Sequence, residues 1–205
     1  VGLFLLTSMI IKDSSHKIRN IFFAILTLTL LLSFAPQAWL DRMSTIKQGA
    51  GESSSLGRIV VWKWTLDYAM ENPILGGGFY AFKANAGVLQ NYADENTTIG
   101  KAKTGKAFHN IYFEVLGGHG FVGLSIFLLI IFYTFNTNRR LQKITQTDEW
   151  IPALAQKINQ SLAIYCVCGL FIGVAFYPWL YYFLGLSVCL DYVHKTKLKE
   201  LSQKP

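Results

Sequence analysis

The chain has 205 residues, of which 52% are hydrophobic, 15% aromatic and only 15% charged. This composition excludes a disordered chain and a coiled coil, and three cysteines, an odd number, exclude a fully paired disulfide framework. The net charge of +7 would favour nucleic acid as the partner of a soluble domain. Here the basic residues instead flank long apolar runs, so the sequence predicts a membrane protein with no nucleic-acid partner.

Two apolar runs open the chain. Residues 1–11 are too few to cross a bilayer and look like the end of a helix, so we expect a part of a longer protein or a truncated gene product. Residues 20–40 carry no charge and match the roughly 20 apolar residues that a membrane span requires. They are the clearest transmembrane helix that the sequence predicts.

The second half of the chain predicts a further span and a hairpin. Residues 109–135 form an apolar run that contains one carboxylate, Glu114. Residues 161–193 are too many for one span, and Pro178 interrupts them. We therefore expect two short helices that meet in a hairpin.

The orientation follows from the basic residues. Lys and Arg concentrate before the first predicted span, in residues 136–160 and in the tail 194–205, and positive charge is retained on the cytoplasmic side. Residues 41–108 then form one large extracytoplasmic loop. The predicted fold is all-α, a single polytopic integral membrane domain in which a helical bundle carries this loop.

The large loop contains a predicted helix over residues 57–71, which ends at Asn72-Pro73. Three of its residues have rings that favour the headgroup level of a bilayer: Trp62, Trp64 and Tyr68. We therefore expect an interfacial amphipathic helix and not a span. The alternative is a surface-lying helix with a snorkelling Arg58.

Two further features of the loop are candidates for binding an anion. The amides of Gly77 and Gly78 can form an anion nest, although a plain turn after the helix is the simpler explanation for these glycines. Three lysines that precede the next helix attract a phosphate or an anionic headgroup: Lys101, Lys103 and Lys106. The alternative for the lysines is a solvated basic loop.

His109 stands at the outer end of the predicted span 109–135. The positive end of the helix dipole disfavours imidazolium there, which suits a general base, and the alternative is an ordinary interfacial hydrogen-bonding residue. Glu114, further along the same helix, is either a structural group or part of a proton relay. His119 lies among glycines, and we expect it to be packed and hydrogen-bonded.

The sequence predicts neither a metal nor a nucleotide cofactor. His109 and His119 are ten residues apart and fall on different faces of a helix, and no metal-ligand spacing accompanies them. A phosphate-binding loop, a nucleophile elbow and a dinucleotide fingerprint are also missing from the sequence.

The order of the motifs resembles the O-antigen ligase and polymerase family, and within it the O-glycosylation ligases associated with exosortase systems. The resemblance is strong from residue 41 to about residue 132. It rests on these motifs: Asp41-Arg42-Met43-Ser44-Thr45-Ile46, Ser54-Ser55-Leu56-Gly57-Arg58 with Trp62, Asn72-Pro73-Ile74-Leu75-Gly76-Gly77-Gly78-Phe79, His109-Asn110-Ile111-Tyr112 with Leu116, and Gly120-Phe121-Val122-Gly123-Leu124. Each motif is loose by itself, whereas their order and spacing are specific.

The resemblance implies a multi-pass glycosyltransferase of the bacterial inner membrane with a periplasmic active-site loop. Its donor is a glycan on undecaprenyl diphosphate, its acceptor is a hydroxyl of a protein or a lipid, and it uses no metal or other cofactor. Arg42 and Arg58 match the arginines of the family and would stabilise the leaving diphosphate, with Lys101, Lys103 and Lys106 adding to its field. His109 matches the family histidine, which orients or deprotonates the acceptor, and supporting groups are Glu114, Gly77 and Gly78.

The chain departs from the family in two places. Close relatives have an acidic residue shortly before the histidine and another before the final His-Gly, where this chain has Lys106-Ala107-Phe108 and Gly118. Members also have about twice as many spans, so we expect these 205 residues to be inactive alone. Three other functions remain open: a polymerase of the same family, a transporter segment broken at Pro178, and a non-catalytic membrane scaffold.

Overall fold

The computed structural model describes residues 50–93, 105–144 and 150–203, with a few isolated positions between 19 and 29, and side chains of the first range from residue 55 onward. The chain divides into two compact units, Val1–Leu56 and Gly57–Pro205, and the second contains nearly all of the described residues. Outside the described residues lie the predicted partial helix 1–11, most of the predicted span 20–40, and three candidate site residues: Arg42, Lys101 and Lys103.

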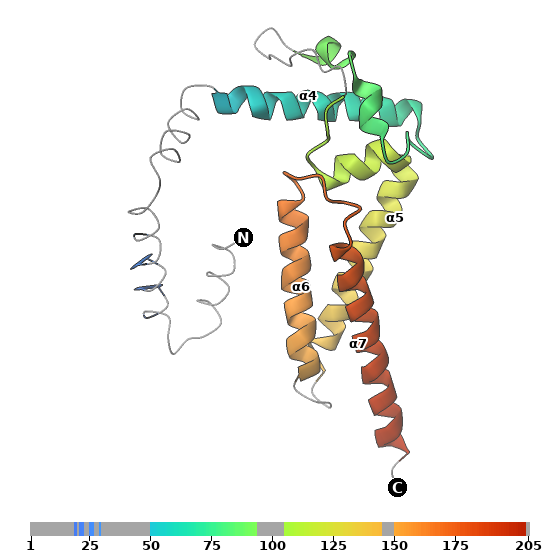
Figure 1. Ribbon diagram of the computed structural model, residues 1–205. Helices are drawn as coiled ribbons and strands as arrows, with labels where there is room; N and C mark the ends of the chain where they lie inside the picture. Colours follow the sequence, from blue (N-terminus) through green and yellow to red (C-terminus); the bar gives the residue numbers. More distant parts are fainter. Residues whose placement is uncertain are drawn as a thin grey trace. The chain divides into compact units, whose positions relative to one another are not determined.

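The described ranges contain helices and no strand, which confirms the all-α prediction for them (Figure 1). The order of elements is α4 (Ala50–Glu71), the short 3-10 helices η2 (Ala81–Asn85) and η3 (Leu89–Tyr92), α5 (Ile111–Leu141), α6 (Trp150–Cys168) and α7 (Trp179–Ser202). Pro178 directly precedes α7.

Helix α4 contains the predicted helix 57–71 and begins earlier, at Ala50. Its end agrees with the sequence signal, because the Asn72 side chain donates to Tyr68 O at 3.1 Å and Pro73 cannot continue the helix. The sequence predicted an amphipathic helix, but α4 does not have one polar face and one apolar face. One face is buried in a cluster that includes Val61 and Trp64, and the other exposes apolar residues beside the charged ones: Ile59, Leu66 and Met70.

Helices α5, α6 and α7 pack against one another and share two clusters of buried side chains. One cluster surrounds Ile111 and Leu180 near the start of α5, and the other surrounds Leu141 and Leu190 near its end. Between them, the buried Asn138 side chain of α5 donates a hydrogen bond of 2.9 Å to the Ser187 hydroxyl of α7.

Among the described helices, α5 alone is long and apolar enough to cross a membrane. Its 31 residues would measure about 46 Å as one straight helix, more than the roughly 30 Å of a bilayer's hydrocarbon core. The helix is not one straight rod of this length, because Gly120 has a φ of 62° and a ψ of −166°, which break the helix and form a kink. The part after the kink, residues 121–141, has about the length of one span.

Candidate active site

The segment that carries His109 is held from one side by α4. The Trp62 indole donates a hydrogen bond of 2.8 Å to the carbonyl of Phe108, and the same ring stacks on Phe113 at 5.1 Å between centroids. The Phe108 side chain is itself buried against Trp64. The peptide group just before His109 is therefore fixed by two tryptophans that sequence reasoning assigned to the headgroup level.

Asn110 holds the same segment from the other side. Its side-chain oxygen caps α5 by accepting the amide of Tyr112 at 2.9 Å, and its side-chain nitrogen donates to Leu170 O at 3.2 Å. The amide of Ile111 also donates to Gly169 O at 2.8 Å. The first turn of α5 is thus tied to the α6–α7 connection, residues 169–178.

His109 lies between these two fixed residues, with an exposed side chain and a φ of 49°. A residue other than glycine rarely adopts this left-handed conformation, and such strain persists only where the surrounding structure enforces it. The buried neighbours Phe108 and Asn110 supply that restraint. The imidazole therefore projects outward at the N-terminus of α5, where a general base would be accessible to a substrate.

Lys106 is positioned by a residue that the sequence did not single out. Asn85, at the end of η2, is fully buried and forms two hydrogen bonds with the Lys106 backbone: it donates to the carbonyl at 2.9 Å and accepts from the amide at 2.8 Å. Next to it, Gly105 has a φ of 80° and packs closely against η2. No periodicity marks Asn85, so only its burial reveals this clamp.

Arg58 lies on α4, one turn before Trp62 on the same side of the helix. It is half-buried, and it forms no hydrogen bond or ion pair with another residue of the described ranges. The described part of the chain therefore does not engage the hydrogen-bond donors of its guanidinium. Through Trp62, the structure brings Arg58 to the part of α4 that contacts the peptide before His109.

Glu114 and the two glycines have structural partners. The Glu114 carboxylate accepts the amide of Ala175 in the α6–α7 connection at 3.0 Å, so it is engaged away from His109. The amides of Gly77 and Gly78 donate to the carbonyls of Gly117 and Gly118 at 3.0 and 2.7 Å. These amides do not form the anion nest that was considered for them, because α5 already occupies them.

His119 differs from its expectation. Its ring is packed, with Phe79 and Phe176 at 4.9 and 5.0 Å between centroids, but its Nδ1 is buried and has no hydrogen-bond partner in the described part of the chain. Of the neighbouring glycines, Gly118 and Gly120 pack against the loop after α4.

No side chain of the described ranges binds the His109 imidazole. The same ranges contain no group of three or more His, Cys, Asp or Glu residues that would hold a metal ion.

A comparison with protein families identifies a match. The family model described as O-antigen ligase matches residues 1–128, which is more than half of the chain. The matched region includes Arg42, Arg58, His109 and the kink at Gly120. No curated protein and no solved structure matches the chain.

Proposed function

The chain belongs to the O-antigen ligase family, and we propose that it transfers a glycan from undecaprenyl diphosphate to an acceptor hydroxyl on the periplasmic face of the bacterial inner membrane. The observation that carries this proposal is the strained, exposed His109 held beside α4. The family is membrane-associated, and its members join or polymerise glycans. The donor, the acceptor and the side of the membrane are parts of the proposal.

The reaction has one bond that forms and one that breaks. The acceptor oxygen forms a bond to the anomeric carbon of the donor glycan, and the bond between that carbon and the diphosphate oxygen breaks. His109 accepts the proton of the acceptor hydroxyl, because it is the accessible imidazole at the site. Without a proton or a cation beside it, the leaving diphosphate would carry its full negative charge.

Arg58 is proposed to stabilise that leaving group. A guanidinium forms bidentate hydrogen bonds to phosphate oxygens and stays charged at any physiological pH. Lys106, whose backbone Asn85 fixes, adds positive charge three residues before His109. Arg42, Lys101 and Lys103 are proposed to act on the same diphosphate, on the strength of the family resemblance and their charge.

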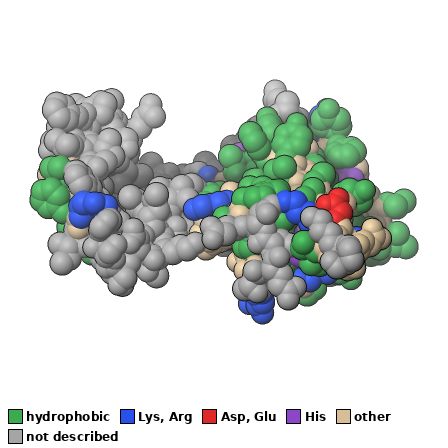
Figure 2. Space-filling view, turned by 90° about the horizontal axis from the view of Figure 1, so that it is seen from below, with side chains coloured by type: hydrophobic (Ala, Val, Ile, Leu, Met, Phe, Trp, Pro, Cys, Tyr) green, Lys and Arg blue, Asp and Glu red, His purple; other side chains and the backbone are tan. Residues whose placement is uncertain are grey.

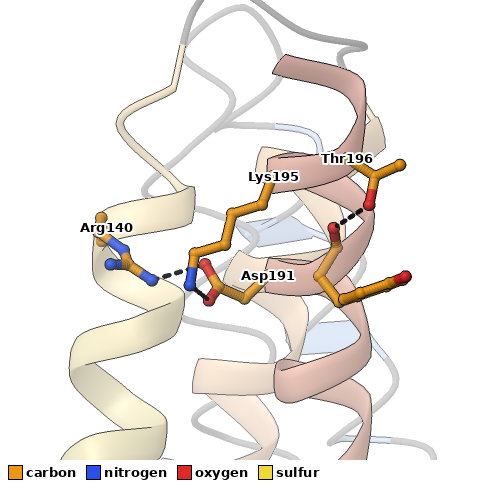
Figure 3. A network of polar contacts seen from close by, with 5 residues as sticks. Arg140, Asp191, Lys195 and Thr196 are labelled. Carbon is orange, nitrogen blue, oxygen red and sulfur yellow. Dashed lines mark hydrogen bonds and ion pairs between the residues drawn. The ribbon is translucent and has the colours of Figure 1, made fainter. Parts of the chain in front are cut away.

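The proposed topology places the site outside the cytoplasm. Arg140 at the end of α5 pairs with Asp191 of α7 at 2.5 Å, and Lys195 pairs with the same carboxylate at 2.7 Å (Figure 3). The basic ends of α5 and α7 therefore lie together, as the positive-inside rule requires of one cytoplasmic end. His109 belongs to the opposite end of α5, which supports a periplasmic site.

We extend the proposal to the exosortase-associated O-glycosylation ligases, because the order of motifs from residue 41 to 132 resembles theirs. A polymerase would use the same donor chemistry and differ only in its acceptor. Identifying the product separates the two functions: a polymerase lengthens the lipid-linked glycan, and a ligase moves it to another molecule.

The test compares His109→Ala with the unchanged protein, in cells that express the complete gene product containing this chain. We expect glycan transfer to stop and lipid-linked glycan to accumulate at matched membrane abundance. Gln90→Ala, at an exposed position of η3, serves as the matched control and should leave transfer unchanged. Unchanged transfer in His109→Ala would overturn the assignment of His109 as the base.

A further inference from the structure

Two apolar segments remain exposed beside the kink of α5. In the loop after α4, the side chains of Ile74, Leu75 and Phe79 are 65%, 80% and 65% exposed. At the junction of the α6–α7 connection with α7, Tyr177 and Trp179 are 58% and 59% exposed. We name these five residues the apolar rim. Exposed apolar patches of this kind mark a surface that another phase or molecule covers.

The two segments of the apolar rim are joined by aromatic contacts. The ring of Phe79 meets Phe176 edge-on, with 4.9 Å between the centroids, and both rings contact His119. Neither segment contains a charged residue over residues 73–82 or 169–190. Charge complementarity therefore plays no part in what the rim binds, and its partner must itself be apolar.

The rim lies level with the outer end of the candidate span. The Phe121 amide donates to Pro73 O at 2.8 Å, and the Gly78 amide donates to Gly118 O at 2.7 Å, so the loop is docked at the Gly120 kink. From the kink to the basic end of α5, residues 121–141 measure about 30 Å, which matches the hydrocarbon core of a bilayer. If the basic end lies at the inner boundary, the outer boundary falls at the rim.

The exposed apolar surface continues from the rim along α5. Phe121 and Val122, the first residues after the kink, are 41% and 48% exposed, and Ile126 is 53% exposed one turn further. Figure 2 views the molecule from the end that holds the C-terminus, and there too hydrophobic side chains predominate over charged ones among the described residues of the unit 57–205. This continuity with a lipid-facing helix favours lipid over a second protein as the cover of the rim.

We propose that the bilayer itself covers the apolar rim, in that Ile74, Leu75 and Phe79 insert among the acyl chains of the outer leaflet while Tyr177 and Trp179 lie at its headgroups. This proposal rests on the proposed membrane topology. The division between the two groups follows the preference of tryptophan and tyrosine for the headgroup level and of aliphatic side chains for the interior.

The inserted rim sets the height of the active site. Because the loop is hydrogen-bonded to α5 itself, the membrane depth of the rim and that of the first turns of α5 are linked. Only residues 111–119, a helical path of about 14 Å, separate the His109 segment from the kink at Gly120. The imidazole is thereby held within reach of a diphosphate whose polyprenyl chain stays in the bilayer.

The test measures contact with lipid directly. A single cysteine at Leu75 is labelled with an environment-sensitive fluorophore, after the native Cys166, Cys168 and Cys189 are replaced by serine. The complete protein is reconstituted in vesicles whose lipids carry a spin-label quencher on the acyl chain. A label at Ile126 on α5 serves as the lipid-exposed reference, and a label at Gln90 on η3 as the aqueous reference.

We expect quenching at Leu75 to approach that at Ile126 and to exceed that at Gln90 severalfold. Quenching equal to that at Gln90 would overturn the proposal. Cross-linking of two chains through the same cysteine, with no quenching, would overturn it in favour of a second copy as the cover. Because the measurement needs no substrate, its failure is distinguishable from failure of glycan transfer in the His109→Ala experiment.

Discussion

The two ends of the α5–α7 bundle are held together by different kinds of bond. At the outer end, the partners are largely backbone groups: the amides of Gly77 and Gly78 on the carbonyls of Gly117 and Gly118, and the amide of Phe121 on the carbonyl of Pro73. At the inner end, side chains meet side chains, as Arg140 and Lys195 do with Asp191. The outer end carries the candidate site, and the inner end carries the basic residues.

This difference has a physical consequence for tolerance to substitution. Backbone groups meet only where side chains leave room, so the outer end depends on glycines whose replacement moves main-chain atoms. Ion pairs whose basic partners are exposed, such as Arg140 and Lys195 here, tolerate small shifts and contribute little to stability. The outer end is therefore rigid, as positioned chemical groups require, and the inner end tolerates substitutions better.

The largest effect is expected from Gly120→Ala. A Cβ atom there would lie 2.8 Å from the carbonyl carbon of Pro73, and alanine strongly disfavours the φ and ψ of this kink. We expect a loss of about 3 kcal/mol of stability and at least a tenfold loss of glycan transfer. Thermal unfolding in detergent micelles measures the first quantity.

Gly185→Ala is the matched control for that change. Gly185 lies within α7, and a Cβ atom there would meet no atom within 4 Å. We expect this variant to keep full transfer and to gain up to about 1 kcal/mol, because alanine favours a helix over glycine. Equal melting temperatures for the two variants would contradict the view that the kink is a close backbone contact.

An intermediate effect is expected from Asn85→Leu at the outer end, compared with Asn138→Leu at the inner end. The first change leaves the amide and the carbonyl of Lys106 without partners, which costs about 2–3 kcal/mol and displaces the segment that leads to His109. The second removes one hydrogen bond to Ser187 and also an unpartnered buried oxygen. We expect it to cost less than about 1 kcal/mol.

Both the stability and the glycan transfer of the two asparagine variants are measured and compared. Transfer should fall in Asn85→Leu and persist in Asn138→Leu at equal membrane abundance. A greater loss of transfer from the inner substitution would reverse the assignment of the rigid end.

The smallest effect is expected from Asp191→Asn. The side chains of Arg140 and Lys195 are each 60% exposed, so that solvent and salt screen their pairing with Asp191. We expect a loss below about 1 kcal/mol that shrinks further at high salt, with transfer unchanged. Melting temperatures measured at low and high ionic strength test this, and a large loss that is independent of salt would speak against it.

The sequence predicted those features of the fold that local patterns encode. Apolar run length and the Asn72-Pro73 stop predicted helices and the end of α4, and the position of His109 at the start of a helix was predicted from the long apolar run that follows it. Such signals depend on neighbouring residues only. They are therefore visible without any knowledge of the tertiary structure.

Features that depend on contacts between distant segments were not predicted. The clamp of Asn85 on Lys106 joins residues 21 positions apart, and the docking of Gly77 on Gly117 joins residues 40 apart. The aromatic rings of Trp62 and Trp64 were assigned to a membrane interface, although both pack against the segment that carries His109. A tryptophan at a membrane interface and a tryptophan packed against another segment look the same in the sequence. Only the tertiary contacts distinguish them.

The backbone conformation of His109 sets the stability of the fold against the proposed activity at this position. In the left-handed conformation that it adopts, a glycine would relieve about 1 kcal/mol of strain, so folding alone would select glycine there. Under the proposed function, in which His109 is the base, an imidazole in that conformation is a stability–activity trade-off. Such a residue is an attractive place to look when stabilising substitutions raise the yield of the protein and abolish what it does.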